Sequence, residues 1–277
     1  MKKLLITLTL ATVAIWAKAQ VPVIQKPGLT GTTGTMVQPF LFSVNTLTAE
    51  TPFWNLQYSG SYGERTAYPF GYDGVDQQLS VKGYLGNRFT LFSSAALGFD
   101  HAGHVASAQQ AEVIRDFIGG KKAFGARFGL GMGVSHDFSN TTAIFSRVTG
   151  SFEVAKWRVG GNLRFEKAFS TRRDDIDLIT SFGFHHRIAG SFFAGVEAIG
   201  QDLEGFWEQD EAEGGAKLLV GPSINMAPAN SRFAFSICGG PVFYATHSTV
   251  MPSQAIRDIP LQNGFTLRGM VSFNLHQ

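Results

Sequence analysis

The sequence predicts an all-β protein in which about twelve antiparallel strands close into a single barrel. Three observations support this prediction. Segments of ten or more residues alternate between apolar and polar side chains, as strands with two different faces do. The connections between these segments alternate between short and long. Beyond residue 20, no apolar run reaches the roughly 18 residues that a membrane-spanning helix needs, so membrane insertion would require closed strands.

The N-terminal residues have the features of a secretory signal peptide. Two lysines precede an apolar run, and residues 17–19 (AKA) supply the small side chains of a cleavage site. We therefore expect residues 1–19 to be removed on export, so that the mature chain starts at Gln20. The only cysteine, Cys238, has no intramolecular partner for a disulfide, so the exported chain needs another source of stability.

The charge of the mature chain gives no reason to expect nucleic acid as a partner. The whole chain carries 23 Lys and Arg against 21 Asp and Glu, a net charge of +2. Three of these bases lie in the signal peptide, which leaves 20 bases against 21 acids after cleavage. A nearly neutral chain has no general attraction to a polyanion.

The segment that follows the signal peptide differs in composition from the rest of the chain. Residues 20–52 contain the run PGLTGTTGT and very few charges. Such a composition predicts irregular structure, and we interpret this segment as an N-terminal arm or plug. The barrel is then expected over residues 53–277.

The alternating segments show which face of each strand is apolar. In FGARFGLGMGVS, residues 124–135, every second side chain is Phe, Ala, Leu, Met or Val, and the others are Gly, Arg or Ser. The segment WRVGGNLRFE, residues 157–166, alternates in the same way. One segment is ambiguous, because residues 105–118 fit either a strand or a short helix. If it is a helix, a strand near residues 36–45 could restore twelve.

Long alternating strands, an export signal and many aromatic residues together resemble bacterial outer-membrane β-barrel proteins of the porin-like kind. The resemblance covers residues 53–277. It implies outer-membrane lipid around the apolar faces, short periplasmic turns, longer external loops and a polar interior. One departure is the C-terminus, FNLHQ, which does not end on an aromatic residue. The competing fold is a secreted soluble β-sandwich, in which the Phe-rich faces would pack between two sheets.

The polar face of the predicted strands carries more bases than acids, ten against four, which predicts a basic lumen. Since rings of Arg and Lys select anions, we expect a passive or substrate-selective diffusion channel that favours small anionic solutes. Four of the arginines (Arg127, Arg147, Arg158 and Arg164) would form a basic stripe on adjacent strands. The bases are Lys82, Arg88, Arg127, Arg147, Arg158, Arg164, Arg187, Lys217, Arg232 and Arg268, and the acids are Glu153, Glu166, Asp177 and Glu197.

Two other functions are compatible with the sequence. The first is a structural or surface-interaction barrel whose lumen is filled by side chains and by the arm. The second is a lipid hydrolase, which needs a hydroxyl, a base and an orienting group in contact. The sequence has no G-x-S-x-G or H-E-x-x-H motif, so we predict a protein that is not an enzyme and needs no cofactor. The hydrolase candidates are His136 with Asp137 and Ser139, the pair His185 and His186, and His247 with Ser248.

Two further motifs have simpler explanations than a ligand site. GLGMG at residues 129–133 resembles a dinucleotide fingerprint, but its glycines lie inside a predicted strand with no helix after them. We expect these glycines to face inward and to leave room for neighbouring side chains or for the arm. Residues 201–215 carry six acids and no base, without the spacing of a calcium loop. We predict a solvated external loop that holds no metal. The sequence does not indicate an oligomeric state.

Overall fold

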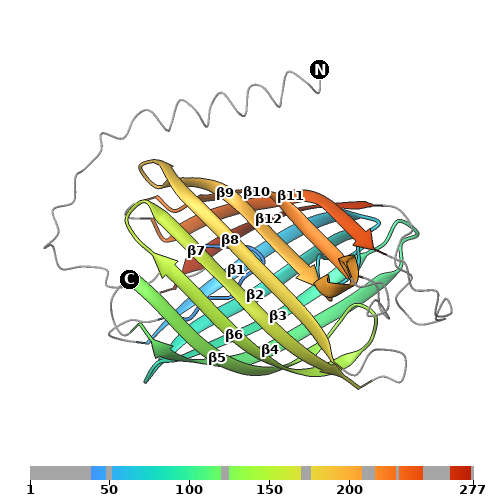
Figure 1. The fold of residues 1–277 in the computed structure, drawn as a ribbon, viewed down its shortest axis with the longest axis horizontal. Coiled ribbons are helices and arrows are strands. Elements are labelled where there is room, and N and C mark those ends of the chain that lie inside the picture. The colour runs from blue at the N-terminus through green and yellow to red at the C-terminus, as the bar shows by residue number, and fades with distance from the viewer. Residues whose placement is uncertain are drawn as a thin grey trace, which may run out of the picture. The chain divides into compact units, whose positions relative to one another are not determined.

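The computed structural model describes residues 39–47, 52–119, 125–169, 176–207, 216–228, 231–245 and 263–275. These residues belong to one compact unit of the chain, residues 33–277. They form twelve β-strands that pair antiparallel into a closed barrel (Figure 1), which confirms the predicted fold. The soluble β-sandwich is the wrong alternative, because one continuous sheet closes on itself and, among the described residues, no second sheet covers its apolar face.

Each strand pairs with its neighbours in chain order, and the first strand pairs with the last to close the barrel. The described residues contain no helix of the length and apolarity needed to cross a membrane. The elements are β1 (Phe53–Glu64), β2 (Gly74–Gly86), β3 (Phe89–Phe99), β4 (Val105–Ile118), β5 (Gly125–His136), β6 (Thr142–Glu153), β7 (Trp157–Ala168), β8 (Asp177–Ala189), β9 (Phe192–Gln201), the short 3-10 helix η1 (Leu203–Phe206), β10 (Ala216–Met226), β11 (Phe233–Ala245) and β12 (Gly264–Asn274).

The ambiguous segment 105–118 is a strand, so the helical alternative is wrong. In β4 the side chains of Glu112, Ile114 and Asp116 are buried, whereas those of Val113 and Arg115 are exposed. Burial therefore alternates with a period of two residues, which is the period of a strand and not of a helix.

The two faces of the barrel wall are reversed relative to a soluble protein. Apolar side chains point outward, as at Leu130, Phe165 and Val271, which are 44%, 41% and 37% exposed. Polar and charged side chains point inward and are buried, as at Arg127 and Glu166. This arrangement confirms the face assignment made from the alternation, and it is the arrangement of a barrel with an apolar surrounding and a polar lumen.

The two ends of the barrel differ in the length of their connections. Longer connections link the strands at one end, as at residues 65–73, 202–215 and 246–263. Short turns join them at the other end, as at residues 87–88 and 190–191. We call these the long-loop end and the short-turn end. Since β1 begins and β12 ends at the short-turn end, the chain enters and leaves the barrel on the same side.

Candidate functional site: the lumen and the segment inside it

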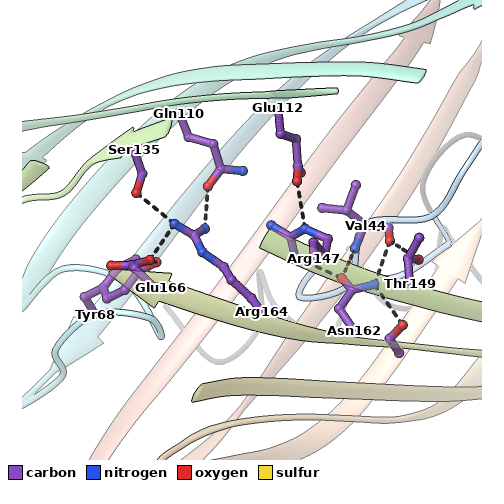
Figure 2. A network of polar contacts seen from close by, with 11 residues as sticks. Val44, Tyr68, Gln110, Glu112, Ser135, Arg147, Thr149, Asn162, Arg164 and Glu166 are labelled. Atoms are coloured by element: carbon purple, nitrogen blue, oxygen red, sulfur yellow. Dashed lines mark hydrogen bonds and ion pairs between the residues drawn. The ribbon is translucent and has the colours of Figure 1, made fainter. Parts of the chain in front are cut away.

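The lumen contains ion pairs between inward side chains of the same strand or of nearby strands. Arg147 Nε donates to Glu112 Oε2 across 2.8 Å, and Arg164 Nη2 lies 2.6 Å from Glu166 Oε2 (Figure 2). A third pair joins Arg127 Nη1 to an oxygen of Asp116 at 3.4 Å. All six side chains are almost fully buried. Buried charges are tolerated only when they are paired in this way, so the pairs hold the wall in one arrangement.

Arg164 is held by several partners at once. Its guanidinium donates to Gln110 Oε1 and to Ser135 Oγ, both at 2.8 Å (Figure 2). The same guanidinium lies 3.7 Å from the centre of the Phe145 ring, which is a cation–π contact. The carboxylate of its partner Glu166 also accepts a hydrogen bond of 3.0 Å from the Tyr68 hydroxyl. This network joins β4, β5 and β7 to the loop that follows β1.

The remaining inward charges are also in contact with polar groups. Arg268 lies 3.7 Å from Asp76, and Arg158 lies 4.0 Å from Glu153 and 3.5 Å from the centre of the Phe193 ring. The other inward charges contact polar atoms of the wall, of the arm or of the loop between β1 and β2. They are Lys82, Lys217, Asp177 and Glu197.

The predicted excess of ten bases over four acids is wrong for the described wall. Three buried acids were missed: Asp76, Glu112 and Asp116. Three of the predicted bases, Arg88, Arg187 and Arg232, are exposed at the short-turn end instead of being enclosed in the lumen. The described wall therefore has seven inward acids and seven inward bases. The acids are Asp76, Glu112, Asp116, Glu153, Glu166, Asp177 and Glu197, and the bases are Lys82, Arg127, Arg147, Arg158, Arg164, Lys217 and Arg268.

The errors in this count have local causes. Glu112 and Asp116 lie in the segment whose alternation also fitted a helix. Asp76 lies at the long-loop end of β2, within residues 64–76, which the sequence pattern predicts to be a long connection between strands. Arg88 lies in the turn between β2 and β3, where Asn87 and Arg88 both have positive φ angles (49° and 68°). Two-residue hairpin loops favour positive φ angles at both of their residues. In this conformation the side chain of Arg88 points away from the lumen.

We expect Glu112→Ala to lower the free energy of unfolding by about 3–5 kcal/mol, because it leaves the Arg147 charge buried without its carboxylate. Urea titration in phospholipid vesicles measures this loss. The matched control is Glu64→Ala, which removes an exposed carboxylate 3.8 Å from Arg65 and should cost less than about 1 kcal/mol. Equal losses in the two variants would show that the buried pair is not structural.

The loop between β1 and β2 folds into the mouth at the long-loop end. Phe70 is fully buried in an apolar cluster with Ile179 and Leu219. The ring of Tyr72 packs on that of Phe138 with 4.9 Å between the ring centres. Burial, together with the nearby carboxylates of Asp100 and Asp73, raises the pKa of the Tyr72 hydroxyl, so this side chain is neutral at physiological pH. The loop therefore narrows the mouth with aromatic side chains.

The hydrolase candidates that the structure describes do not form a catalytic triad. His185 Nε2 lies 2.9 Å from Ser223 Oγ, but Ser223 donates its own proton to Glu197, and His185 Nδ1 has no hydrogen-bond partner among the described residues. A catalytic triad needs the carboxylate on the histidine instead. His185 is also fully buried, with the Phe40 ring centre 4.6 Å from its own.

The other candidate groups have structural roles or lie elsewhere. His186 points outward and contacts the ring of Trp157, with 5.6 Å between the ring centres. The carboxylate of Asp137 accepts hydrogen bonds from Ser139 and from the backbone N–H of Thr141, which stabilise the turn after β5, and His136 contacts a threonine hydroxyl. The pair His247 and Ser248 lies outside the described residues.

The glycines of the GLGMG motif face inward, as predicted. A Cβ atom at Gly129 would lie 2.6 Å from Thr46 Cγ2, and one at Gly133 would lie 2.5 Å from the Phe145 ring. These glycines leave room for the arm and for a wall side chain. Of the acidic segment 201–215, residues 208–215 lie outside the described residues, and the described part of the chain contains no cluster of three metal-binding side chains.

A cavity of about 180 Å³ occupies the lumen on the side of the long-loop end. The side chains of Arg147, Arg164 and Arg268 line it, together with the amides of several glutamines and the hydroxyls of several serines. Leu41, Phe42 and Val44 line it as well, although they precede the first strand. The arm therefore bounds the cavity inside the barrel.

Residues 40–47 of the arm have no helix or strand of their own, and all except Leu41 are buried. They contact inward side chains from both sides of the barrel, from Glu197 on β9 to Thr90 on β3. Between these two points, Val44 contacts Asn162 on β7 and Thr149 on β6 (Figure 2). The segment therefore crosses the lumen.

No protein-family model and no curated protein matches the sequence. Several solved structures do resemble the barrel. The NanC porin has a TM-score of 0.54 at 12% identity, over 79% of this chain and 100% of that chain. An outer-membrane channel from Pseudomonas putida F1 has a TM-score of 0.51 at 10% identity, over 87% and 100%. The KdgM porin, in complex with disordered oligogalacturonate, has a TM-score of 0.50 at 10% identity, over 80% and 99%. The chain therefore has the fold of porin-like outer-membrane β-barrels.

Proposed function

We propose that the protein is a diffusion channel of the bacterial outer membrane. The observation that carries this proposal is the polar cavity inside a closed barrel with an apolar outer face. We place the barrel in the membrane with its short-turn end toward the periplasm and its long-loop end toward the outside of the cell, as in bacterial outer-membrane barrels. Export through a cleaved signal peptide at residues 1–19 is part of the proposal.

We propose further that the cavity favours small anionic solutes. The wall as a whole is neutral, but its ion pairs are oriented relative to the cavity. Arg147 and Arg164 line the cavity, whereas their partners Glu112 and Glu166 do not. With Arg268, three guanidiniums face the cavity against the two carboxylates of Asp76 and Asp137. A solute there meets more positive than negative charge, and one fold neighbour was solved in complex with oligogalacturonate.

Reversal potentials in planar bilayers under a salt gradient test this proposal. We expect the full-length protein to prefer anions, and we expect Arg268→Glu to move the reversal potential toward cation selectivity, because it inverts a charge on the cavity lining. The matched control is Arg88→Glu, which inverts an exposed charge in a turn and should leave the reversal potential unchanged. A cation-selective wild-type channel would contradict the proposal.

A structural or surface-interaction barrel is the second candidate. It is favoured by one observation, that residues 40–47 cross the lumen and are almost entirely buried there. The two functions differ in conductance. A barrel that stays silent in bilayers, even in variants that remove the segment from the lumen, would support the structural function.

A further inference from the structure

The lumen wall holds backbone groups of residues 40–47 by hydrogen bonds from its side chains. The N–H groups of Leu41 and Phe42 both donate to Glu197 Oε2, at 2.7 and 3.0 Å. At the other side of the barrel, the N–H of Leu47 donates to Thr90 Oγ1 at 2.9 Å. The segment is thus held at both ends through atoms that any peptide has.

The middle of the segment is held most closely, at Val44 (Figure 2). Its N–H donates to Asn162 Oδ1 at 2.6 Å, and its carbonyl oxygen accepts from Asn162 Nδ2 and from Thr149 Oγ1, both at 2.8 Å. One asparagine amide therefore binds both backbone groups of one residue. This is how an amide side chain recognises a peptide backbone without reading its sequence.

Apolar side chains of the segment fit separate pockets in the wall. Phe40 lies where the wall has two glycines, because a Cβ atom would approach its ring to 2.3 Å at Gly183 and to 2.9 Å at Gly160. The other three buried apolar side chains of the segment each pack in a different apolar cluster. Phe42 packs on Ile179, Ile199 and Leu219, Val44 on Phe92 and Ile114, and Leu47 on Tyr84.

Backbone hydrogen bonds combined with pockets for particular side chains are the two parts of a peptide-binding site. We propose that the inner wall is a binding site for a peptide segment, and that residues 40–47 occupy it reversibly as a tethered plug. This inference goes beyond the channel function and does not depend on it, because it concerns which groups the wall binds.

Two features of the barrel make this occupancy reversible. Every strand already has two neighbours, so the backbone ladder is complete without the segment. The wall groups that the segment would leave, including Glu197, Asn162 and Lys82, are polar. Asn162 already lines the adjoining cavity, and Glu197 binds the N–H groups of Leu41 and Phe42, which line it too, so water can enter where the segment leaves. Departure of the segment therefore breaks no strand pairing and leaves few groups that water cannot satisfy.

Thiol modification of the full-length chain tests the reversible occupancy. In Ser43→Cys the introduced thiol replaces a hydroxyl that is 4% exposed in the plug, and the native Cys238, which is 1% exposed in the wall, is the matched control. Under native conditions we expect N-ethylmaleimide to modify position 43 at least about tenfold faster than Cys238, because local opening precedes unfolding of the barrel. Mass spectrometry measures both rates. Equal protection of both thiols until urea unfolds the barrel would overturn the proposal.

A peptide added in excess tests the binding site itself. The probe is PFLFSVNTL, the sequence of residues 39–47. If it binds the vacated wall, it keeps the tethered segment out and increases the modification rate at position 43. The matched control is the same peptide with an N-methyl group on the Val44 nitrogen, which cannot donate to Asn162 and should act about tenfold more weakly. Equal effects of both peptides, or no effect of either, would show that the wall does not recognise a peptide. Neither assay requires the barrel to conduct.

Discussion

The double variant Phe42→Asp/Val44→Asp should increase the conductance of single channels in planar bilayers by roughly twofold or more. Both side chains lie in apolar pockets of the lumen wall, with Ile179 and Phe92 among their neighbours. Unpaired carboxylates in such pockets cost several kcal/mol, and the segment avoids this cost by leaving the lumen. The cavity then continues past the place where the segment crossed, and a wider pore passes more current.

A disulfide between the segment and the wall should have the opposite effect and keep residues 40–47 in the lumen. Ser43 Oγ donates to Ser181 Oγ at 3.0 Å, so Ser43→Cys/Ser181→Cys places two thiols within reach of a disulfide. We combine it with Cys238→Ser to remove the only other thiol. Oxidation should hold the conductance at its lowest level, and a reductant should release it. If the oxidised, reduced and doubly aspartate-substituted channels all conduct equally, the segment does not obstruct the lumen.

The variant Ala95→Arg should fail to assemble in the outer membrane. Ala95 lies near the middle of β3 and points outward, so that an arginine there would face lipid close to the centre of the bilayer. A cation at that depth destabilises a transmembrane barrel by about 2–4 kcal/mol. The amount of protein in outer-membrane fractions, and the share that migrates faster on gels when unheated, measure this loss.

The adjacent residue supplies the matched control. Ser94 lies at the same depth of the same strand but lines the cavity. An arginine from Ser94→Arg would enter a polar, water-accessible space beside other charged side chains, so that this variant should assemble nearly as well as the wild type. Equal assembly of the two variants would mean that the two faces of β3 meet the same medium.

The sequence was sufficient to predict the barrel and, where the alternation is strong, the direction of the side chains. The pattern of residues 124–135 identifies one strand face by face, since lipid and lumen impose opposite polarities on neighbouring positions. The pattern is weaker in β4, because its alanines and glutamines differ less in polarity than Arg127 and Phe128 of β5 do. As a result, Glu112 and Asp116 were missed, and with them the partners of Arg147 and Arg127.

The binding of the arm could not be predicted from the sequence. Glu197 is separated from Phe42 by 155 positions, and Asn162 is separated from Val44 by 118. Neither pair leaves a local pattern, because the two partners are brought together by the closed barrel and not by neighbouring positions in the chain. The sequence did indicate that residues 20–52 differ from the strands and that inward glycines leave space. It did not indicate that Gly129 would leave that space for Thr46.

The pairing of β1 with β12 also means that the barrel can close only after its last strand has been synthesised. Asn55 pairs with Asn274 and Glu64 with Phe265, so the contact that closes the sheet joins the two ends of the barrel sequence. Contacts of such long sequence separation form slowly. A nascent chain that has not reached Gly264 has unpaired edges on β1 and β11, which template aggregation. Premature termination within β2–β11 therefore leaves the edge of β1 without its native partner, so we expect such a chain to be an open sheet prone to aggregation.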